Sequence, residues 1–289
     1  MDELNIRLRE TAAVLERAAA ADPFIPRPTR ALPGVDVTRE MMHLVKALLF
    51  PGFFDDAGRD AETLVNRLHA SLDEQVRACT RFRDEEQRAS SASPSPALAF
   101  IERLPEIKRL LSTDVKAVRD GDPAATSAGE VICCYPAILA MTHYRVAREL
   151  LLLGVPLLPR VITELAHSAT GIDIHPGARV GEYFSIDHGT GVVIGETCII
   201  GNRVRLYQGV TLGAKSFTLD SDGLPVNLPR HPVIEDNVII YSNSTILGRV
   251  TIGHDSIIGG NIWLTRDVPP HSRVLQRRAT RGFTDGLGI

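Results

Sequence analysis

The 289-residue sequence is poor in aromatic residues, in cysteine and in net charge. Aromatic side chains make up 5% of the chain and the formal net charge at pH 7 is −3, so nothing points to nucleic acid or an anionic membrane as a partner. None of the four cysteines has the spacing of a metal site, and we expect reduced, buried thiols in a cytoplasmic protein. The four are Cys79, Cys133, Cys134 and Cys198.

Long hydrophobic runs are also missing. The most apolar stretch, 150–158, is short and broken by Gly154 and Pro156, so it is not expected to span a bilayer. The chain begins Met-Asp-Glu, without a basic segment ahead of an apolar one, and we therefore expect no signal peptide.

A six-residue repeat dominates residues 171–270. The longest uninterrupted run of large aliphatic residues at this spacing is Ile234, Ile240, Ile246, Ile252, Ile258 and Leu264. A period of six fits neither an α-helix nor an ordinary strand and is typical of a hexapeptide-repeat, left-handed parallel β-helix. Three hexads close one triangular coil, and the aliphatic residue of each hexad points into a continuous core.

Residues 1–170 contain helical patterns and no strand patterns. Helices are predicted over residues 3–20, from a cap at Thr38 to residue 49, from about residue 60, over 98–118 with an interruption near Pro105, over 136–153, and over 159–168. The predicted fold class is α+β: a helical N-terminal domain over 1–170, the β-helix over 171–270, and a tail over 271–289.

Two insertions break the six-residue repeat. Ile186 and Ile194 are eight residues apart, and Leu212 and Ile234 are twenty-two apart. Because the core register resumes after each break, the extra residues must leave the coil as loops, and such loops on a rigid scaffold commonly carry function. The first loop contains His188 and the second ends at His231.

His188 is a candidate general base. It is flanked by Asp187 and Gly189 on a polar loop, and Asp173 lies fifteen residues earlier, which is close to one eighteen-residue coil. Stacking of coils would bring Asp173 within reach of the imidazole, fix its tautomer and leave the other ring nitrogen free to take a proton from a hydroxyl. A purely structural hydrogen bond would fit the same spacing.

Arg230 and His231 close the second loop. They are expected to re-enter the coil at the edge where the first loop projects, and the guanidinium suits a carboxylate-bearing substrate. A solvated rim of the protein is the simpler alternative for an isolated Arg-His pair.

Four segments together resemble serine O-acetyltransferase, the enzyme that starts cysteine biosynthesis. They are Asp173-Ile-His-Pro, Asp187-His188-Gly-Thr-Gly-Val-Val-Ile-Gly-Glu-Thr, Gln208-Gly-Val-Thr-Leu-Gly and Arg230-His231-Pro. The resemblance covers residues 111–270, including Asp122-Pro-Ala in the helical part. The hexads alone would fit any acyltransferase of this fold, whereas the Asp-His loop with Arg-His-Pro narrows the resemblance to the serine enzyme.

The resemblance implies a role for each matching residue. His188 would be the general base and Asp173 its orienting carboxylate, while Asp122 and Asp187 would hold the substrate amino acid. Its carboxylate would contact Arg230 and His231. Gly213, Ala214 and Ser242 would line the pantetheine arm of acetyl-CoA, a co-substrate, with no permanent cofactor and no metal. L-cysteine would be a feedback inhibitor, and the chain would form a homotrimer or a dimer of trimers through its helical half.

The C-terminal region departs from the family in one respect and follows it in another. Val274-Leu-Gln-Arg277-Arg278 replaces the usual Gly-x-Pro-Ala stretch, and we expect Arg277 or Arg278 to meet a phosphate of the coenzyme. The final residue, Ile289, resembles the C-terminal isoleucine through which family members bind cysteine synthase.

Three alternatives remain open from the sequence. Another hexapeptide acyltransferase would use a different hydroxyl acceptor. A γ-type carbonic anhydrase shares the fold and would need three histidines on zinc, for which His188, His231 and His254 are available. A non-catalytic partner of cysteine synthase would use only the tail.

Overall fold

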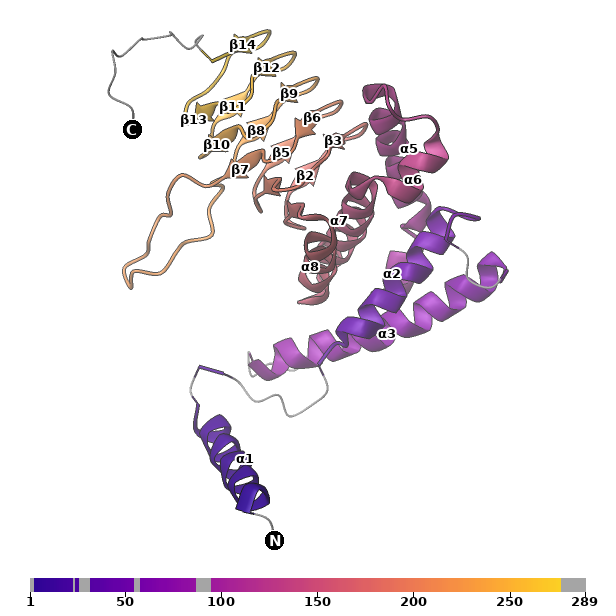
Figure 1. The fold of residues 1–289 in the computed structure, drawn as a ribbon, viewed down its shortest axis with the longest axis vertical. Coiled ribbons are helices and arrows are strands. Elements are labelled where there is room, and N and C mark those ends of the chain that lie inside the picture. The colour runs from indigo at the N-terminus through magenta and orange to yellow at the C-terminus, as the bar shows by residue number, and fades with distance from the viewer. Residues whose placement is uncertain (1–2, 23, 26–31, 55–57, 87–94, 277–289) are drawn as a thin grey trace.

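The computed structural model describes residues 3–22, 24–25, 32–54, 58–86 and 95–276. It has a helical N-terminal half followed by a parallel β-helix, so the predicted fold class is confirmed (Figure 1). The described helices are α1 Glu3–Ala21, α2 Val35–Leu49, α3 Ala61–Glu86, α4 Ala97–Ile101, α5 Leu104–Gly121, α6 Ala128–Cys134, α7 Pro136–Leu152 and α8 Leu158–Thr170.

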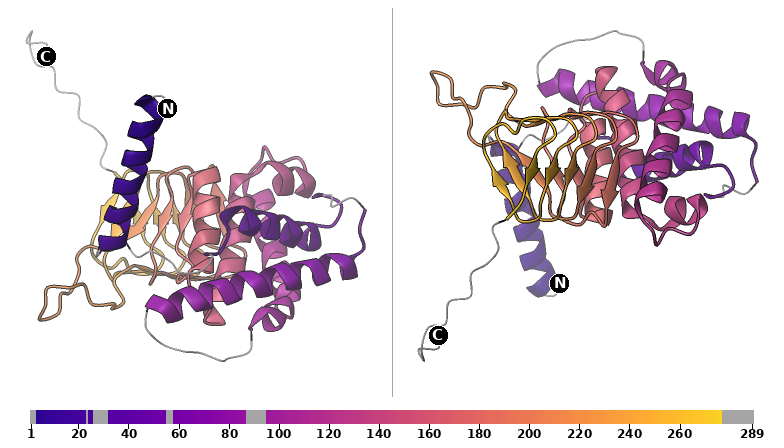
Figure 2. Two further views of the ribbon diagram at one scale, coloured as in Figure 1. Left: turned by 90° about the horizontal axis from the view of Figure 1, so that it is seen from below. Right: turned by 90° about the horizontal axis from the view of Figure 1, so that it is seen from above.

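The helices α5 to α8 lie between the β-helix and the α2–α3 pair, whereas α1 stands apart from the rest (Figures 1 and 2). No residue of α1 is buried, so its apolar face does not pack into the core of the described chain. None of the described helices is both long enough and apolar enough to cross a membrane.

Two details of the helical half differ from the sequence prediction. Thr38 does not cap α2, because the helix already begins at Val35 and the buried Thr38 hydroxyl donates to the Gly34 carbonyl at 2.8 Å. The helix α6 was not predicted at all. Its signal is Ser127-Ala-Gly-Glu130, the sequence pattern of a capping box: Ser127 accepts from the Glu130 N–H at 3.1 Å, while the Glu130 carboxylate accepts from the N–H of Thr126, one residue before the cap, at 2.7 Å.

The β-helix consists of three parallel sheets. We call them sheet 1 (β1-β4-β7-β10-β13), sheet 2 (β2-β5-β8-β11) and sheet 3 (β3-β6-β9-β12-β14). The strands are β1 Asp173–Ile174, β2 Arg179–Val180, β3 Ser185–Asp187, β4 Val193–Ile194, β5 Ile199–Ile200, β6 Arg205–Tyr207, β7 Thr211–Gly213, β8 Val233–Ile234, β9 Ile239–Ile240, β10 Thr245–Leu247, β11 Thr251–Ile252, β12 Ile257–Ile258, β13 Trp263–Leu264 and β14 Arg273–Val274.

The core is built as the hexads predict. Ile194 pairs with Leu212, and Leu212 pairs with Ile246, so the inward aliphatic residues of successive coils lie one above the other. All three are at most 1% exposed. Cys198 is also buried here, but Cys133 and Cys134 are exposed at the end of α6. The prediction of buried thiols was therefore wrong for these two, because a seven-residue surface helix presents its last turn to solvent.

The chain turns three corners in each coil, and we name them by the sheets they join. Edge 3/1 follows sheet 3 and contains the first insertion. Edge 1/2 follows sheet 1 and contains the second insertion, which forms a projecting hairpin with an antiparallel bridge between Leu219 and Pro225. Edge 2/3 carries no insertion. The functional residues are described below by these edges.

A buried ion pair joins the helices to the first coil. Arg145 of α7 donates to both carboxylate oxygens of Asp114 of α5, at 2.6 and 2.9 Å. The same carboxylate accepts from the Phe184 N–H at 3.2 Å, and Arg145 also donates to the Gly181 carbonyl at 2.9 Å. Since Asp114 and Arg145 are 0% and 4% exposed, the two halves of the chain share one continuous interior.

Candidate active site

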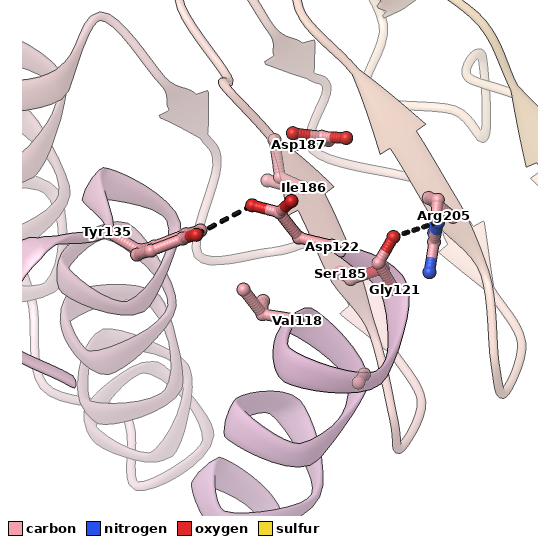
Figure 3. A pocket seen from close by; sticks show the side chains of 9 residues that line it. Val118, Gly121, Asp122, Tyr135, Ser185, Ile186, Asp187 and Arg205 are labelled. Atoms are coloured by element: carbon pink, nitrogen blue, oxygen red, sulfur yellow. Dashed lines mark hydrogen bonds between the residues drawn. The ribbon is translucent and has the colours of Figure 1, made fainter. Parts of the chain in front are cut away.

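A small pocket lies where the end of α5 meets edge 3/1 (Figure 3). The helix ends at Gly121, whose carbonyl accepts from Arg205 Nη1 at 2.8 Å, and Asp122 follows as the capping residue. The carboxylate of Asp122 accepts from the Tyr135 hydroxyl at 2.6 Å and from the Ala124 N–H at 2.8 Å. Asp187 lies on the opposite wall of this pocket, at the end of β3.

These contacts fix the charge of Asp122. The hydrogen bond from Tyr135, and then that from the Ala124 N–H, lowers the pKa of the Asp122 carboxyl, with a further contribution from nearby His188. The same hydrogen bond raises the pKa of Tyr135 to about 12. The pocket therefore offers an ionised carboxylate, held by a neutral phenol, to a cationic ligand group.

His188 lies at edge 3/1 beside this pocket. Its ring Nε2 is 3.8 Å from Asp187 Oδ1, its side chain is 75% exposed, and its backbone adopts a left-handed φ of 57°. The following loop folds back over the first coil, where the Gly191 N–H donates to the Gly171 carbonyl at 2.8 Å. Gly189 needs to be glycine, since it has a φ of 102° and a Cβ there would come within 2.5 Å of Ile172.

Asp173 lies at the same edge, at the start of β1 immediately after Ile172. Its carboxylate is grouped with Glu164 and His167 of α8, the three ligand atoms lying within 4.8 Å of one another. In the described part of the chain, no hydrogen bond or ion pair joins Asp173 to His188. The orienting role of Asp173 thus stays a prediction, supported by its place at the same edge.

Arg230 and His231 lie at edge 1/2. Arg230 Nη2 donates to the Glu196 carboxylate at 2.6 Å, and Nη1 donates to Asn227 Oδ1 at 3.0 Å. Among the described residues, the Arg230 Nε is buried and has no hydrogen-bond partner.

The tautomer of His231 follows from its contacts with Thr197. The Thr197 hydroxyl accepts from the Arg230 and His231 backbone N–H groups at 2.9 and 3.0 Å. Its own hydrogen is then directed to His231 Nδ1, 2.9 Å away, which also accepts from the Thr197 N–H at 3.1 Å. Because Nδ1 is an acceptor, the hydrogen of a neutral ring is on Nε2, where it can be donated to a carboxylate.

Burial keeps this ring neutral. His231 is 7% exposed, and desolvation, together with the charge of Arg230, lowers its pKa to about 4. Burial likewise lowers the pKa of His143, on α7, to about 4. Each group has an ordinary pKa of 6.5, so the unfolded chain binds more protons than the folded chain between pH 6.5 and pH 4.

We expect the free energy of unfolding to fall as the pH is lowered from 6.5 to 4, by on the order of 2 kcal/mol for each of the two histidines. Urea unfolding at a series of pH values measures this. His143→Gln, which has no imidazole to protonate, should flatten the dependence. A free energy of unfolding that is constant from pH 7 to pH 5 in the parent protein would contradict the assignment.

The two groups of candidate residues do not meet in one chain, contrary to the sequence prediction. His188 and Asp187 are at edge 3/1, whereas Arg230 and His231 are at edge 1/2, across the width of sheet 1. The reason is that the long loop leaves after β7 in sheet 1 and returns ahead of β8 in sheet 2. One chain therefore presents two half-sites.

The remaining predicted residues divide in the same way. Gly213 and Ala214 are at edge 1/2 and Ser242 is at edge 3/1, while Arg277, Arg278 and Ile289 lie outside the described residues. His254 is at edge 2/3, so the three histidines considered for zinc belong to three different edges and no single edge collects them.

Sequence reasoning missed three residues of these half-sites: Tyr135, Glu196 and Thr197. Tyr135 follows the overlooked helix α6, and the capping box would have indicated that helix. Glu196 and Thr197 are in the motif that follows His188. Their partners, Arg230 and His231, are thirty-four residues later in the sequence, after the long loop. Only the pairing of β5 with β8 brings those segments together.

Comparisons with known proteins place the chain in a family. The family described as bacterial transferase hexapeptide (six repeats) matches residues 231–261. A serine acetyltransferase of Synechococcus elongatus, described as plasmid, is 47% identical over 286 residues, covering 93% of this chain and 88% of the relative. A serine acetyltransferase of Bacillus subtilis is 44% identical over 58% of this chain and 73% of its own length.

Solved structures give the same result over nearly the whole chain. Isoform 3 of the Entamoeba histolytica serine acetyltransferase, in complex with cysteine, superposes with a TM-score of 0.72 at 32% identity, covering 96% of this chain and 95% of that one. The Neisseria gonorrhoeae enzyme in complex with serine gives 0.58 at 25% identity, covering 97% and 98%. The chain belongs to the serine acetyltransferase family.

Proposed function

We propose that the protein transfers the acetyl group of acetyl-CoA to the hydroxyl of L-serine, giving O-acetylserine and CoA for cysteine biosynthesis. The observation that carries this proposal is a pocket at edge 3/1 that is lined by an ionised Asp122 and by Asp187, with the accessible imidazole of His188 directly after Asp187. An amino acid with a nucleophilic side chain needs an anionic partner for its ammonium and a base for its hydroxyl, and this pocket supplies both.

The reaction is a direct transfer. His188 takes the hydroxyl proton as the serine oxygen attacks the thioester carbonyl, and the resulting imidazolium returns the proton to the departing CoA thiolate. Asp173, at the same edge, would orient the ring and support its charge. No covalent enzyme intermediate is required.

The serine carboxylate would bind the cationic guanidinium of Arg230, whose side chain is partly exposed, and the His231 Nε2–H. Because these residues lie across sheet 1 from His188, a complete site needs edge 1/2 of one copy against edge 3/1 of another. Three copies joined by such contacts in a closed ring would form a homotrimer, and the helical half could join two trimers. L-cysteine, which differs from serine only in its sulfur, would compete for the same site; the Entamoeba histolytica relative is bound to cysteine.

Acetyl-CoA would lie in the groove between those two copies. Gly213 and Ala214 on one side and Ser242 on the other would line its pantetheine arm. Gln208, on the coil next to that of His188, has a buried side-chain oxygen without a partner in the described chain, an acceptor for an amide N–H of that arm. Arg277 or Arg278 would meet a coenzyme phosphate, and Ile289 would dock into cysteine synthase in the cytoplasm.

Thr197 offers a test of carboxylate recognition. Thr197→Val removes the acceptor of two backbone N–H groups and should raise the KM for L-serine about tenfold, since misplacing Arg230 and His231 costs on the order of 1–2 kcal/mol of binding. The Thr197 N–H bond to His231 remains, so kcat should change little. Thr197→Ser keeps the hydroxyl and should behave as the parent. An unchanged KM for L-serine in Thr197→Val would contradict the proposal that Thr197 positions Arg230 and His231 for the substrate carboxylate.

The activity itself is tested by thiol release from acetyl-CoA. Release should depend on L-serine and should not occur with sugars or with amino acids that lack a hydroxyl. Efficient release with another hydroxyl acceptor and none with L-serine would point to a different acyltransferase. Absence of thiol release with every acceptor would favour the alternative that the protein is a non-catalytic partner of cysteine synthase.

A further inference from the structure

Two histidines and an aspartate gather at edge 2/3, away from both half-sites. His254 and Asp255 follow β11, and His271 precedes β14 on the next coil. The His271 N–H donates to the His254 carbonyl at 2.8 Å, so the two residues are stacked by the backbone ladder of the solenoid. Their rings lie edge to face, with centroids 4.8 Å apart.

The side chains of this cluster converge on one point. Asp255 Oδ2 is 2.7 Å from His254 Nδ1 and 3.7 Å from His271 Nδ1, and the three donor atoms all lie within 4.8 Å of one another. The side chains of His254, Asp255 and His271 are 45%, 41% and 70% exposed, so an ion can reach the donors directly from solvent.

Neighbouring groups hold the cluster in this orientation. Asn237 Nδ2 donates to Asp255 Oδ1 at 3.0 Å, which leaves Oδ2 directed at the two imidazoles. The His254 N–H donates to the Glu235 carboxylate at 2.8 Å, on the coil before. Partners of this kind, which orient a ligand without touching the ion, strengthen metal sites.

From this geometry we propose that His254, Asp255 and His271 bind a divalent transition metal, with Zn²⁺, Ni²⁺ and Cu²⁺ preferred over Mg²⁺ and Ca²⁺. Two imidazole nitrogens and one carboxylate oxygen are the donors these ions favour. Small rotations of exposed side chains bring the donors to the separation of about 3.3 Å that a tetrahedral ion with bonds near 2 Å requires. Water completes the coordination.

The position of the site gives its expected effect. The ion would cross-link the last two coils of the described solenoid. Since edge 2/3 is not part of either half-site, the metal would act on the stability of the solenoid and not on acetyl transfer.

One other cluster in the described chain could compete for metal, namely Glu164, His167 and Asp173. It offers a single nitrogen donor, and its Asp173 is a candidate active-site residue. His167→Gln removes that nitrogen and therefore serves as the matched control for substitutions at edge 2/3.

The test uses full-length protein without a histidine tag, dialysed against chelator and titrated with Zn²⁺ by calorimetry. The parent and His167→Gln should each bind one equivalent per chain with micromolar affinity, and His254→Gln/His271→Gln should bind at least thirtyfold more weakly. The thermal midpoint of the parent should rise with added Zn²⁺, and that of the double variant should not. Equal zinc affinity in the parent and the double variant, or loss of binding in His167→Gln instead, would overturn the proposal.

Protons provide an independent readout. The hydrogen bond to Asp255 raises the pKa of His254, the negative charges of Asp255, Glu235 and Asp236 raise it further, and the His271 ring packs edge to face against it. Because protons then compete with the ion for Nδ1, zinc affinity should fall at least tenfold between pH 7.5 and pH 6. A pH-independent affinity would exclude an imidazole ligand.

Discussion

Replacing His188 by asparagine is expected to lower kcat for L-serine acetylation by about 10²- to 10⁴-fold, the usual contribution of a positioned general base. Asparagine is smaller than histidine but keeps a hydrogen-bond donor and an acceptor, and it cannot take up the hydroxyl proton. Its frequent occurrence at left-handed φ also suits the backbone at this position, where φ is 57°. The variant should therefore fold normally and retain the KM for acetyl-CoA, so that the loss falls on the chemical step.

Serine-dependent thiol release measures the effect, and His69→Asn, on α3 and outside the solenoid, is its control. Retention of more than about a tenth of the parent kcat in His188→Asn would exclude His188 as the base.

Asp114→Ala is expected to lower the free energy of unfolding by about 3–5 kcal/mol, because it leaves the Arg145 guanidinium buried without its counter-charge. The substitution also removes the acceptor of the Phe184 N–H. These groups join α5 and α7 to the first coil, so urea unfolding should show a lower midpoint for both halves of the chain.

An exposed ion pair between the same two parts gives the control. Arg109 of α5 donates to both carboxylate oxygens of Glu182, at 2.8 and 3.0 Å, but both side chains are almost half exposed. Arg109→Ala should therefore cost at most about 1 kcal/mol. Equal decreases in the free energy of unfolding of the two variants would show that burial of the Asp114–Arg145 pair does not determine its contribution to stability.

The solenoid could be predicted well from the sequence because its repeat is local. The hexads place Ile194, Leu212 and Ile246 at the same position of successive coils, and parallel strand pairing then stacks these residues in register. The first loop was predicted at the right place for the same reason, because its two extra residues leave the register intact on either side.

The site was less predictable, since it depends on which corner each loop occupies and on contacts between distant segments. Counting hexads places Arg230 after an insertion but does not show that the chain re-enters at sheet 2 and not sheet 1. Tyr135 could not be linked to Asp122, because that contact depends on the angle between α6, α7 and the end of α5. The role of Thr197 could not be predicted, because its hydroxyl accepts from the backbone of two residues on the far side of the long loop.

The separation of the two half-sites by the width of sheet 1 has a consequence for how the enzyme responds to concentration. In the proposed assembly a single chain carries both half-sites but completes neither, so turnover would require association of the copies and would follow mass action. Dilution below the dissociation constant of the ring would abolish activity by dissociation while each chain stays folded. Activity would return when the copies reassociate at higher concentration.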